Sequence, residues 1–124
     1  MNDPASRYRK ASEGISKSDF LSIVANSGLN LTEFSSLLPV SKRTIEKAKD
    51  KDLLSPTVSD RVLQIASLYE HGSMVLGDNL SFREWITTPL ISLGGKKPIA
   101  FINNDTGISM INDLLGRIEH GVYS

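Results

Sequence analysis

The sequence predicts an all-α protein, in which an N-terminal helix–turn–helix bundle packs with a C-terminal helical domain. Three observations lead to this fold class. Apolar residues recur three and four positions apart along most of the chain, which places them on one face of a helix. No stretch sustains the alternation of apolar and polar residues that indicates a strand. Most glycines and prolines fall between the periodic segments, where helices end.

The chain begins with a polar, basic segment. Residues 1–13 contain a single aromatic side chain, and we expect them to form a flexible N-terminal arm. A helix then begins near Ser16 or Ser18, whose hydroxyls can cap it, and ends at Gly28. Its apolar face consists of Phe20, Leu21, Val24 and Ala25.

Two short helices follow, separated by a turn at Pro39. The first begins at Thr32, whose side chain can cap it, and ends at the proline. The second begins at Ser41 and runs to Asp50. Its main inward residues are Ile45 and Ala48.

A longer helix follows Pro56 and extends through Gly72 to Gly77. Thr57 or Ser59 can cap it, and an interior glycine costs a helix about 1 kcal/mol. Its apolar stripe has helical spacing and consists of Val58, Val62, Ile65, Ala66 and Tyr69.

The last part of the chain predicts three more helices. A capping box at Ser81 opens a helix over residues 81–88, with Trp85 in the core. A short helix begins at Pro98, and a final amphipathic helix follows Asp105–Thr106 and ends at a glycine.

Composition narrows the classes of function. The 124 residues suffice for one compact domain, or for two very small ones that share a core. The absence of cysteine excludes disulfides, thiolate metal sites and a cysteine nucleophile. Two histidines are too few to indicate a histidine-rich metal site. No secretory signal or membrane span is visible, so we expect a cytoplasmic protein. No catalytic, metal or cofactor motif rises above chance, which favours a binding protein over an enzyme, with no cofactor.

The net charge of zero excludes a generally basic surface but not a local basic patch. Residues 31–50 have the layout of a DNA-reading helix–turn–helix, whose second helix enters the major groove. Residues 41–51 contain five basic and two acidic residues. An arginine there can pair with a guanine edge, while hydroxyls and lysines can bind phosphate. We expect DNA contacts from Ser41, Lys42, Arg43, Thr44, Lys47 and Lys49.

On periodicity alone, the same segment fits the solvated face of an ordinary helical bundle. A single monomer with so small a contact area should also bind DNA weakly. Specific recognition would therefore need a two-fold dimer that reads a palindrome.

Several short motifs follow one another in the second half of the chain. They are Ser59-Asp60-Arg61, Trp85-Ile86 with Pro89, Gly94-Gly95 with Lys97-Pro98, Asp105-Thr106-Gly107, and Gly116-Arg117-Ile118 with Gly121-Val122. In this order and spacing they resemble the antitoxin domain of the Xre/MbcA/ParS family. The resemblance covers about residues 41–124. We expect an arm over 1–13, a DNA-binding and dimerisation region over 14–56 and a toxin-binding domain over 57–124.

The resemblance implies an antitoxin of a bacterial type II toxin–antitoxin system. Its partner would be a RES-domain toxin that hydrolyses NAD or transfers ADP-ribose from it, and the C-terminal region would block the toxin's active site. The helix–turn–helix would repress the shared operon by binding operator DNA, with the antitoxin a homodimer within a hetero-oligomeric complex. We expect toxin contacts from Lys96, Lys97, Arg117, Glu119, His120, Gly121, Val122, Tyr123 and Ser124.

The end of the sequence has side chains that suit such a contact. Tyr123 offers a large contact area at a low entropic cost. Glu119 and the terminal carboxylate can pair with arginines that hold a pyrophosphate. The alternative is an ordinary frayed terminus. The alternative function for the whole chain is a stand-alone dimeric helix–turn–helix regulator without a toxin partner.

Overall fold

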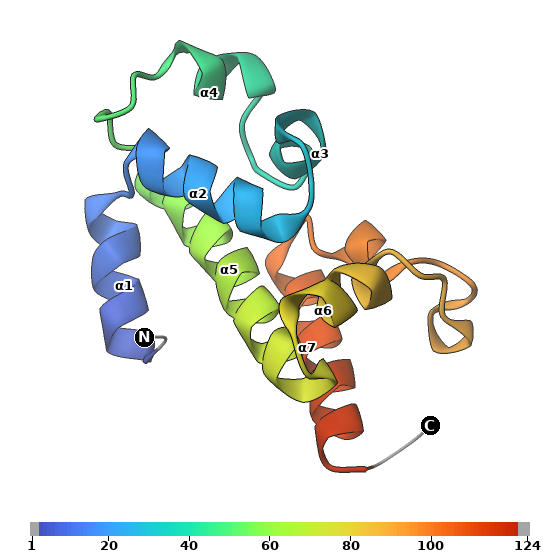
Figure 1. The fold of residues 1–124 in the computed structure, drawn as a ribbon. Helices are drawn as coiled ribbons and strands as arrows, with labels where there is room; N and C mark the ends of the chain where they lie inside the picture. Colours follow the sequence, from blue (N-terminus) through green and yellow to red (C-terminus); the bar gives the residue numbers. More distant parts are fainter. Residues whose placement is uncertain (1–2, 122–124) are drawn as a thin grey trace. The chain divides into compact units, whose positions relative to one another are not determined.

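The fold is that of a computed structural model, which describes residues 3–121. These residues form helices and two isolated β-bridges, with no β-strand among them (Figure 1). The predicted all-α fold class is therefore confirmed. In chain order the elements are α1 (Pro4–Glu13), α2 (Lys17–Ser27), α3 (Leu31–Ser35), α4 (Lys42–Lys47), α5 (Pro56–Leu76), α6 (Asn79–Ile86), the 3₁₀ helices η1 (Ile91–Leu93) and η2 (Pro98–Phe101), and α7 (Asp105–Glu119). Within the described part of the chain, no helix is both long and apolar enough to cross a membrane.

The chain divides into two compact units, Met1–Ala66 and Ser67–Ser124, here called the N-terminal and C-terminal units. The division lies inside α5, further along the chain than the expected boundary after residue 56. Fully buried side chains in the N-terminal unit include Phe20, Phe34, Ile45, Val62 and Ile65. Those in the C-terminal unit include Leu68, Phe82, Ile86, Ile102, Ile111 and Leu115.

Helix α1 occupies the segment expected to be a flexible arm. The Asp3 side chain accepts a hydrogen bond from the Ser6 backbone N–H at 3.1 Å, and Pro4 begins the helix. Gly14 ends it with a φ of 89°, and the Ala11 side chain is buried. The expectation was wrong here because a capping aspartate, a proline and a terminal glycine define a helix even where apolar residues are few.

Helices α2 and α4 begin at the predicted serines. Ser16 Oγ accepts a hydrogen bond from the backbone N–H three residues ahead at 3.1 Å, and Ser41 Oγ does the same at 3.2 Å. Gly28 adopts a left-handed conformation after α2, also as predicted. Helix α4 ends at Lys47, before the predicted Asp50. The recognition-helix candidate is therefore short.

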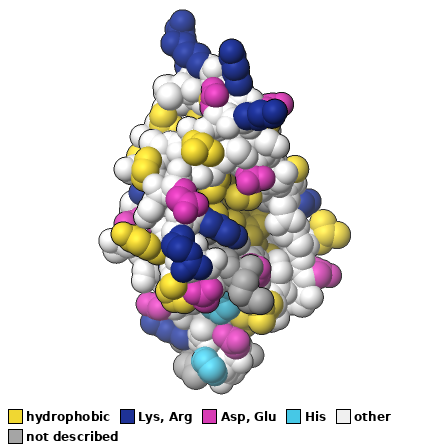
Figure 2. All heavy atoms as spheres, turned by 90° about the vertical axis from the view of Figure 1, so that its left-hand side faces the viewer, with side chains coloured by type: hydrophobic (Ala, Val, Ile, Leu, Met, Phe, Trp, Pro, Cys, Tyr) yellow, Lys and Arg dark blue, Asp and Glu magenta, His cyan; other side chains and the backbone are white. Residues whose placement is uncertain are grey.

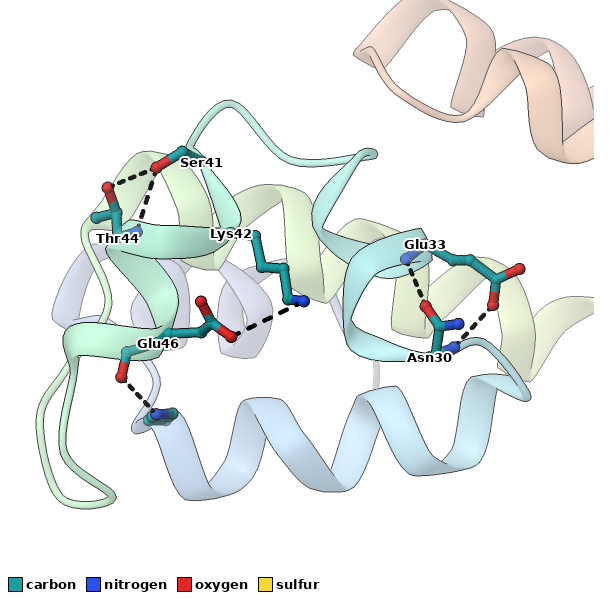
Figure 3. Close-up of polar contacts among 7 residues, drawn as sticks. Asn30, Glu33, Ser41, Lys42, Thr44 and Glu46 are labelled. Atoms are coloured by element: carbon teal, nitrogen blue, oxygen red, sulfur yellow. Dashed lines mark hydrogen bonds and ion pairs between the residues drawn. The ribbon is translucent and has the colours of Figure 1, made fainter.

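Helices α3 and α5 begin earlier than predicted. Asn30 caps α3 by accepting from the Glu33 N–H at 2.7 Å, and the Glu33 carboxylate accepts from the Asn30 N–H at 2.9 Å (Figure 3). The capping residue Asn30 lies two positions before Thr32, so the cap predicted at Thr32 is wrong. At the start of α5, Ser55 Oγ accepts from the Val58 N–H at 3.2 Å.

Ser59, a predicted cap, has a different role. Its hydroxyl is fully buried, accepts a hydrogen bond from the Ile15 N–H at 3.0 Å and donates to the Leu54 carbonyl at 3.2 Å. The Leu54 N–H in turn donates to the Ile15 carbonyl at 2.8 Å. One side chain on α5 thus joins the segment before α2 to the segment before α5.

Helices α6 and α7 are also capped by side chains that the sequence analysis does not single out. Asp78 caps α6 by accepting from the Ser81 N–H at 2.8 Å, so the cap predicted at Ser81 is wrong. Hydrogen bonds from the Ser81 backbone and hydroxyl hold the pKa of Asp78 below its usual value. Asn104 caps α7 by accepting from the Gly107 N–H at 2.8 Å.

The C-terminal unit contains an aromatic cluster that packs on a glycine. A Cβ at Gly72 would overlap the ring of Phe82, so the glycine inside α5 is what allows α6 to approach closely. Tyr69 packs edge-on against the Phe82 ring with centroids 4.8 Å apart, and Trp85 stacks on it at 5.8 Å. Trp85 is half-buried and lies at the edge of the predicted core.

We predict opposite effects for the same substitution at two helical glycines. Gly72→Ala should lower the free energy of unfolding by about 1–3 kcal/mol, because the new methyl group overlaps Phe82. Gly116→Ala, in α7, meets no atom within 4 Å beyond its own helix and should raise it by up to about 1 kcal/mol. Urea unfolding of both variants measures the difference. Stabilisation by both substitutions would contradict the packing of Phe82 on Gly72.

Candidate functional site

The first candidate surface is formed by α4 and the residues that follow it. All six residues expected to contact DNA are exposed: Ser41, Lys42, Arg43, Thr44, Lys47 and Lys49. Ile45 is 1% exposed and anchors α4 to the core of the N-terminal unit from the opposite side. Figure 2 shows lysine and arginine side chains, with a few acidic ones between them, over α4 at the top of the view. We call these six residues the α4 surface.

Within the α4 surface, the polar side chains differ in availability. Ser41 Oγ caps the helix and lies 2.9 Å from Thr44 Oγ1, so the two hydroxyls are hydrogen-bonded to each other (Figure 3). Lys42 Nζ lies 3.8 Å from a Glu46 carboxylate oxygen, an exposed pair four residues apart. Exposed pairs of this kind contribute little to stability, so the lysine can exchange its partner for a phosphate.

The end of α4 is held by a residue that sequence analysis missed. Lys17 Nζ donates to the carbonyl of Ala48 at 2.8 Å and to that of Glu46 at 3.3 Å. A cation is favourable where helix carbonyls lack intrahelical partners. The Lys17 backbone N–H also donates to the Asp52 carbonyl at 2.9 Å. The start of α2 therefore fixes both the end of α4 and the loop after it.

The Ser59-Asp60-Arg61 motif has a structural role in the N-terminal unit. Arg61 is half-buried, and its Nη1 donates to the Leu37 carbonyl at 3.0 Å, in the turn after α3. This contact joins α5 to the turn that leads to α4, whereas the Ser59 hydroxyl joins α5 to the segments before α2 and before α5. The motif positions the α4 surface without belonging to it.

The second candidate surface lies in the C-terminal unit. The described residues expected to contact a toxin are all exposed: Lys96, Lys97, Arg117, Glu119, His120 and Gly121. The other three, Val122, Tyr123 and Ser124, lie outside the described residues. The lysines belong to the loop after η1, whereas the other four lie in or just after the last turn of α7.

A shallow hollow of about 250 Å³ lies between η1 and α7, and Arg117 is the member of this set that lines it. Ser92 and Leu93 from η1 line one side of it, and Met110, Asp113, Leu114 and Arg117 from α7 line the other. Arg117 thus lies beside the loop that carries the two lysines.

Glu119 faces another partner, His71 on α5. The His71 Nε2 lies 3.3 Å from a Glu119 carboxylate oxygen, and its Nδ1 lies 3.0 Å from the Asn112 side-chain oxygen. Both partners are on α7, one near its middle and one in its last turn. His71 has no distinguishing sequence signal because its two partners lie more than forty positions away. Among residues 3–121 there is no group of three or more His, Asp or Glu side chains that could hold a metal ion.

The loop between Leu90 and Lys96 is closed by its own backbone. The Leu90 N–H donates to the Lys96 carbonyl at 3.1 Å, and the Gly95 N–H donates to the Leu90 carbonyl at 2.9 Å. Gly94 and Gly95 both have positive φ values, 68° and 81°, which non-glycine residues rarely adopt. The segment that carries Gly94, Gly95 and Lys96 therefore has a defined conformation.

Comparison with known proteins gives two adjoining family matches. The antitoxin Xre-like helix-turn-helix domain matches residues 6–67, and the antitoxin Xre/MbcA/ParS C-terminal toxin-binding domain matches residues 71–121. Antitoxin Xre of Yersinia enterocolitica is 28% identical over 87 residues, which are 68% of this chain and 59% of that protein. Antitoxin Xre of Photorhabdus laumondii is 28% identical over 67 residues, 53% of this chain and 45% of that protein. The chain thus spans less than two thirds of the length of these relatives.

A solved structure has a similar fold. A chain in the crystal structure of the M. tuberculosis MbcT–MbcA toxin–antitoxin complex matches with a TM-score of 0.63 and 18% sequence identity. The match covers 87% of this chain and 96% of that chain.

We predict that His71 fixes the last turn of α7. In His71→Ala, amide hydrogen exchange near residues 117–120 should become about three- to tenfold faster, because two side-chain hydrogen bonds of about 1 kcal/mol or less each are lost. Exchange in the first turns of α7 should not change. His120→Ala, which alters an exposed histidine in the same region, is the control. Equal exchange in both variants would show that His71 does not hold this turn.

Proposed function

We infer the function from the family, because this chain belongs to the Xre/MbcA/ParS antitoxins. We propose that it is the antitoxin of a type II toxin–antitoxin system, and that it binds and neutralises a cognate RES-domain toxin. The observation that supports this most is the pair of adjoining family matches, one to a helix-turn-helix domain and one to a toxin-binding domain. The division of the structure into two compact units after residue 66 agrees with the two matches.

In this proposal the C-terminal unit blocks the toxin's NAD-consuming site. A pocket for NAD must hold a pyrophosphate, so it presents cationic groups that an acidic side chain can also engage. Glu119 lies in the last turn of α7, next to the exposed His120 and Gly121. His71 holds the Glu119 carboxylate from one side, which fixes the last turn of α7. Residues 121–124, here called the C-terminal segment, follow this turn. Tyr123, further along, has the side-chain type that dominates many protein interfaces.

We further propose that the α4 surface binds operator DNA and represses the operon. The support is the exposure of Arg43 and Lys47 on a short helix that follows a turn, as a helix–turn–helix requires, and of Lys49 just after that helix. One copy of α4 offers few contacts, so a homodimer within the toxin–antitoxin complex would supply two half-sites. The chain acts by binding rather than by catalysis, and needs no cofactor.

The alternative function is a stand-alone dimeric regulator, which the helix-turn-helix match alone would support. Co-expression with the neighbouring open reading frame separates the two. An antitoxin forms a stable complex with that product, whereas a stand-alone regulator purifies without it.

We predict that the double variant Arg43→Ala and Lys47→Ala loses DNA affinity but keeps toxin binding. Two fewer phosphate or base contacts should lower the slope of log affinity against log salt by about 2 per bound copy. Titration of the DNA upstream of the operon at several salt concentrations measures this. The control is Arg9→Ala with Lys10→Ala, which removes the same charge from exposed positions of α1. If toxin binding fell as far as DNA binding, the division between two surfaces would be wrong.

We predict that removing residues 121–124 abolishes neutralisation of the toxin. The truncated chain should remain folded, because every side chain described as buried in the C-terminal unit, up to Leu115, is retained. Growth of cells that co-express toxin and antitoxin is the measurement, and circular dichroism checks the fold. Full rescue of growth by the truncated chain would rule out a blocking role for this segment.

A further inference from the structure

The loop from Leu90 to Lys96 presents an apolar side chain to solvent. Ile91, the first residue of η1, is 98% exposed, the highest value among the large apolar side chains of residues 3–121. In the same turn, Leu93 is half-buried and lines the hollow beside α7. The two side chains therefore differ in direction, with Leu93 toward α7 and Ile91 toward solvent.

Main-chain hydrogen bonds hold Ile91 in this position. The Ile91 carbonyl accepts from the Gly94 N–H at 3.0 Å, and the Leu90 carbonyl accepts from the N–H groups of Leu93 at 3.0 Å and Gly95 at 2.9 Å. A loop closed in this way loses little conformational freedom when it binds, which favours affinity. The isoleucine contributes little to the packed core, so its apolar surface is available for a partner.

The hollow lined by the next two residues of this turn, Ser92 and Leu93, has the composition of a protein interface. The hollow contributes the apolar side chains of Leu93, Met110 and Leu114, with Asp113 and Arg117 also lining it. The exposed Lys96 and Lys97 follow on the same loop. An apolar centre with a charged rim is typical of specific interfaces, and this rim is mainly basic. A matching partner would present an apolar pocket with acidic residues around it.

We propose that Ile91 is a principal contact of this chain with its cognate toxin, inserted into an apolar pocket outside the toxin's active site. This inference rests on the proposed antitoxin function, and it adds a second attachment point to the C-terminal segment. The occupant is the toxin because residues 71–121, which match a toxin-binding domain, contain both the loop and the hollow. Arg117, an expected toxin contact, also lines the hollow, which makes the two parts of the surface continuous.

The test is the affinity of Ile91 variants for the RES-domain protein encoded beside this chain. Ile91→Asp should raise Kd at least about thirtyfold, as a buried interface anchor would, and Ile91→Ala should raise it about tenfold. Met74→Asp and Leu80→Asp are the matched controls, since these apolar side chains of the same unit are 76% and 65% exposed. Both controls should bind like the parent chain. Titration calorimetry gives Kd, and thermal unfolding checks that every variant is folded.

The outcomes separate this inference from the function on which it rests. If the parent chain does not bind the RES-domain protein, the proposed function fails. If the parent chain binds and Ile91→Asp binds equally well, the function stands and the inference is overturned. Equal losses in the Met74 or Leu80 variants would also overturn it, because the effect would not be specific to the loop. So would a changed oligomeric state of free Ile91→Asp, since Ile91 would then mediate self-association.

Discussion

The buried hydroxyl of Ser59 is the contact on which the N-terminal unit most depends. It satisfies the Ile15 N–H and the Leu54 carbonyl, two backbone groups that would otherwise be costly to bury. The segments that it joins lead directly into α2 and α5. Lys17, two residues after Ile15, then reaches the carbonyls at the end of α4. These polar contacts thus fix the end of α4, the helix that carries most of the residues proposed to read DNA.

The sequence predicts the number and type of most helices but not all of their boundaries. Ser16 and Ser41 were predictable as caps because each precedes its helix directly. Asn30, Asp78 and Asn104 were missed because a second plausible cap follows each one within a few residues, and local sequence alone does not decide between them. Helix α1 was missed for another reason: its caps define it, whereas its apolar periodicity is weak.

The features of the candidate surfaces also fall into two groups, those that local sequence predicts and those that depend on tertiary packing. Exposed charged residues next to a turn, such as Arg43 and Lys96, can be identified from the local sequence pattern. Arg43 lies outside the apolar positions of its helix, and Lys96 lies in a loop between helices. The His71 contacts and the fit of Gly72 to Phe82 could not be identified in this way, since each joins residues brought together only by tertiary packing. From the sequence, Gly72 is a residue that destabilises the helix around it. In the structure, its missing side chain leaves the space that the Phe82 ring occupies.

The backbone closure of the loop from Leu90 to Lys96 also bears on how such a protein can diversify. Main-chain hydrogen bonds and two glycines set the shape of this loop, so its conformation depends little on which side chains occupy Ile91, Ser92 or Lys97. Those positions can change through point mutation while the scaffold persists. The surface that this loop presents can therefore be altered at little cost to the stability of the fold.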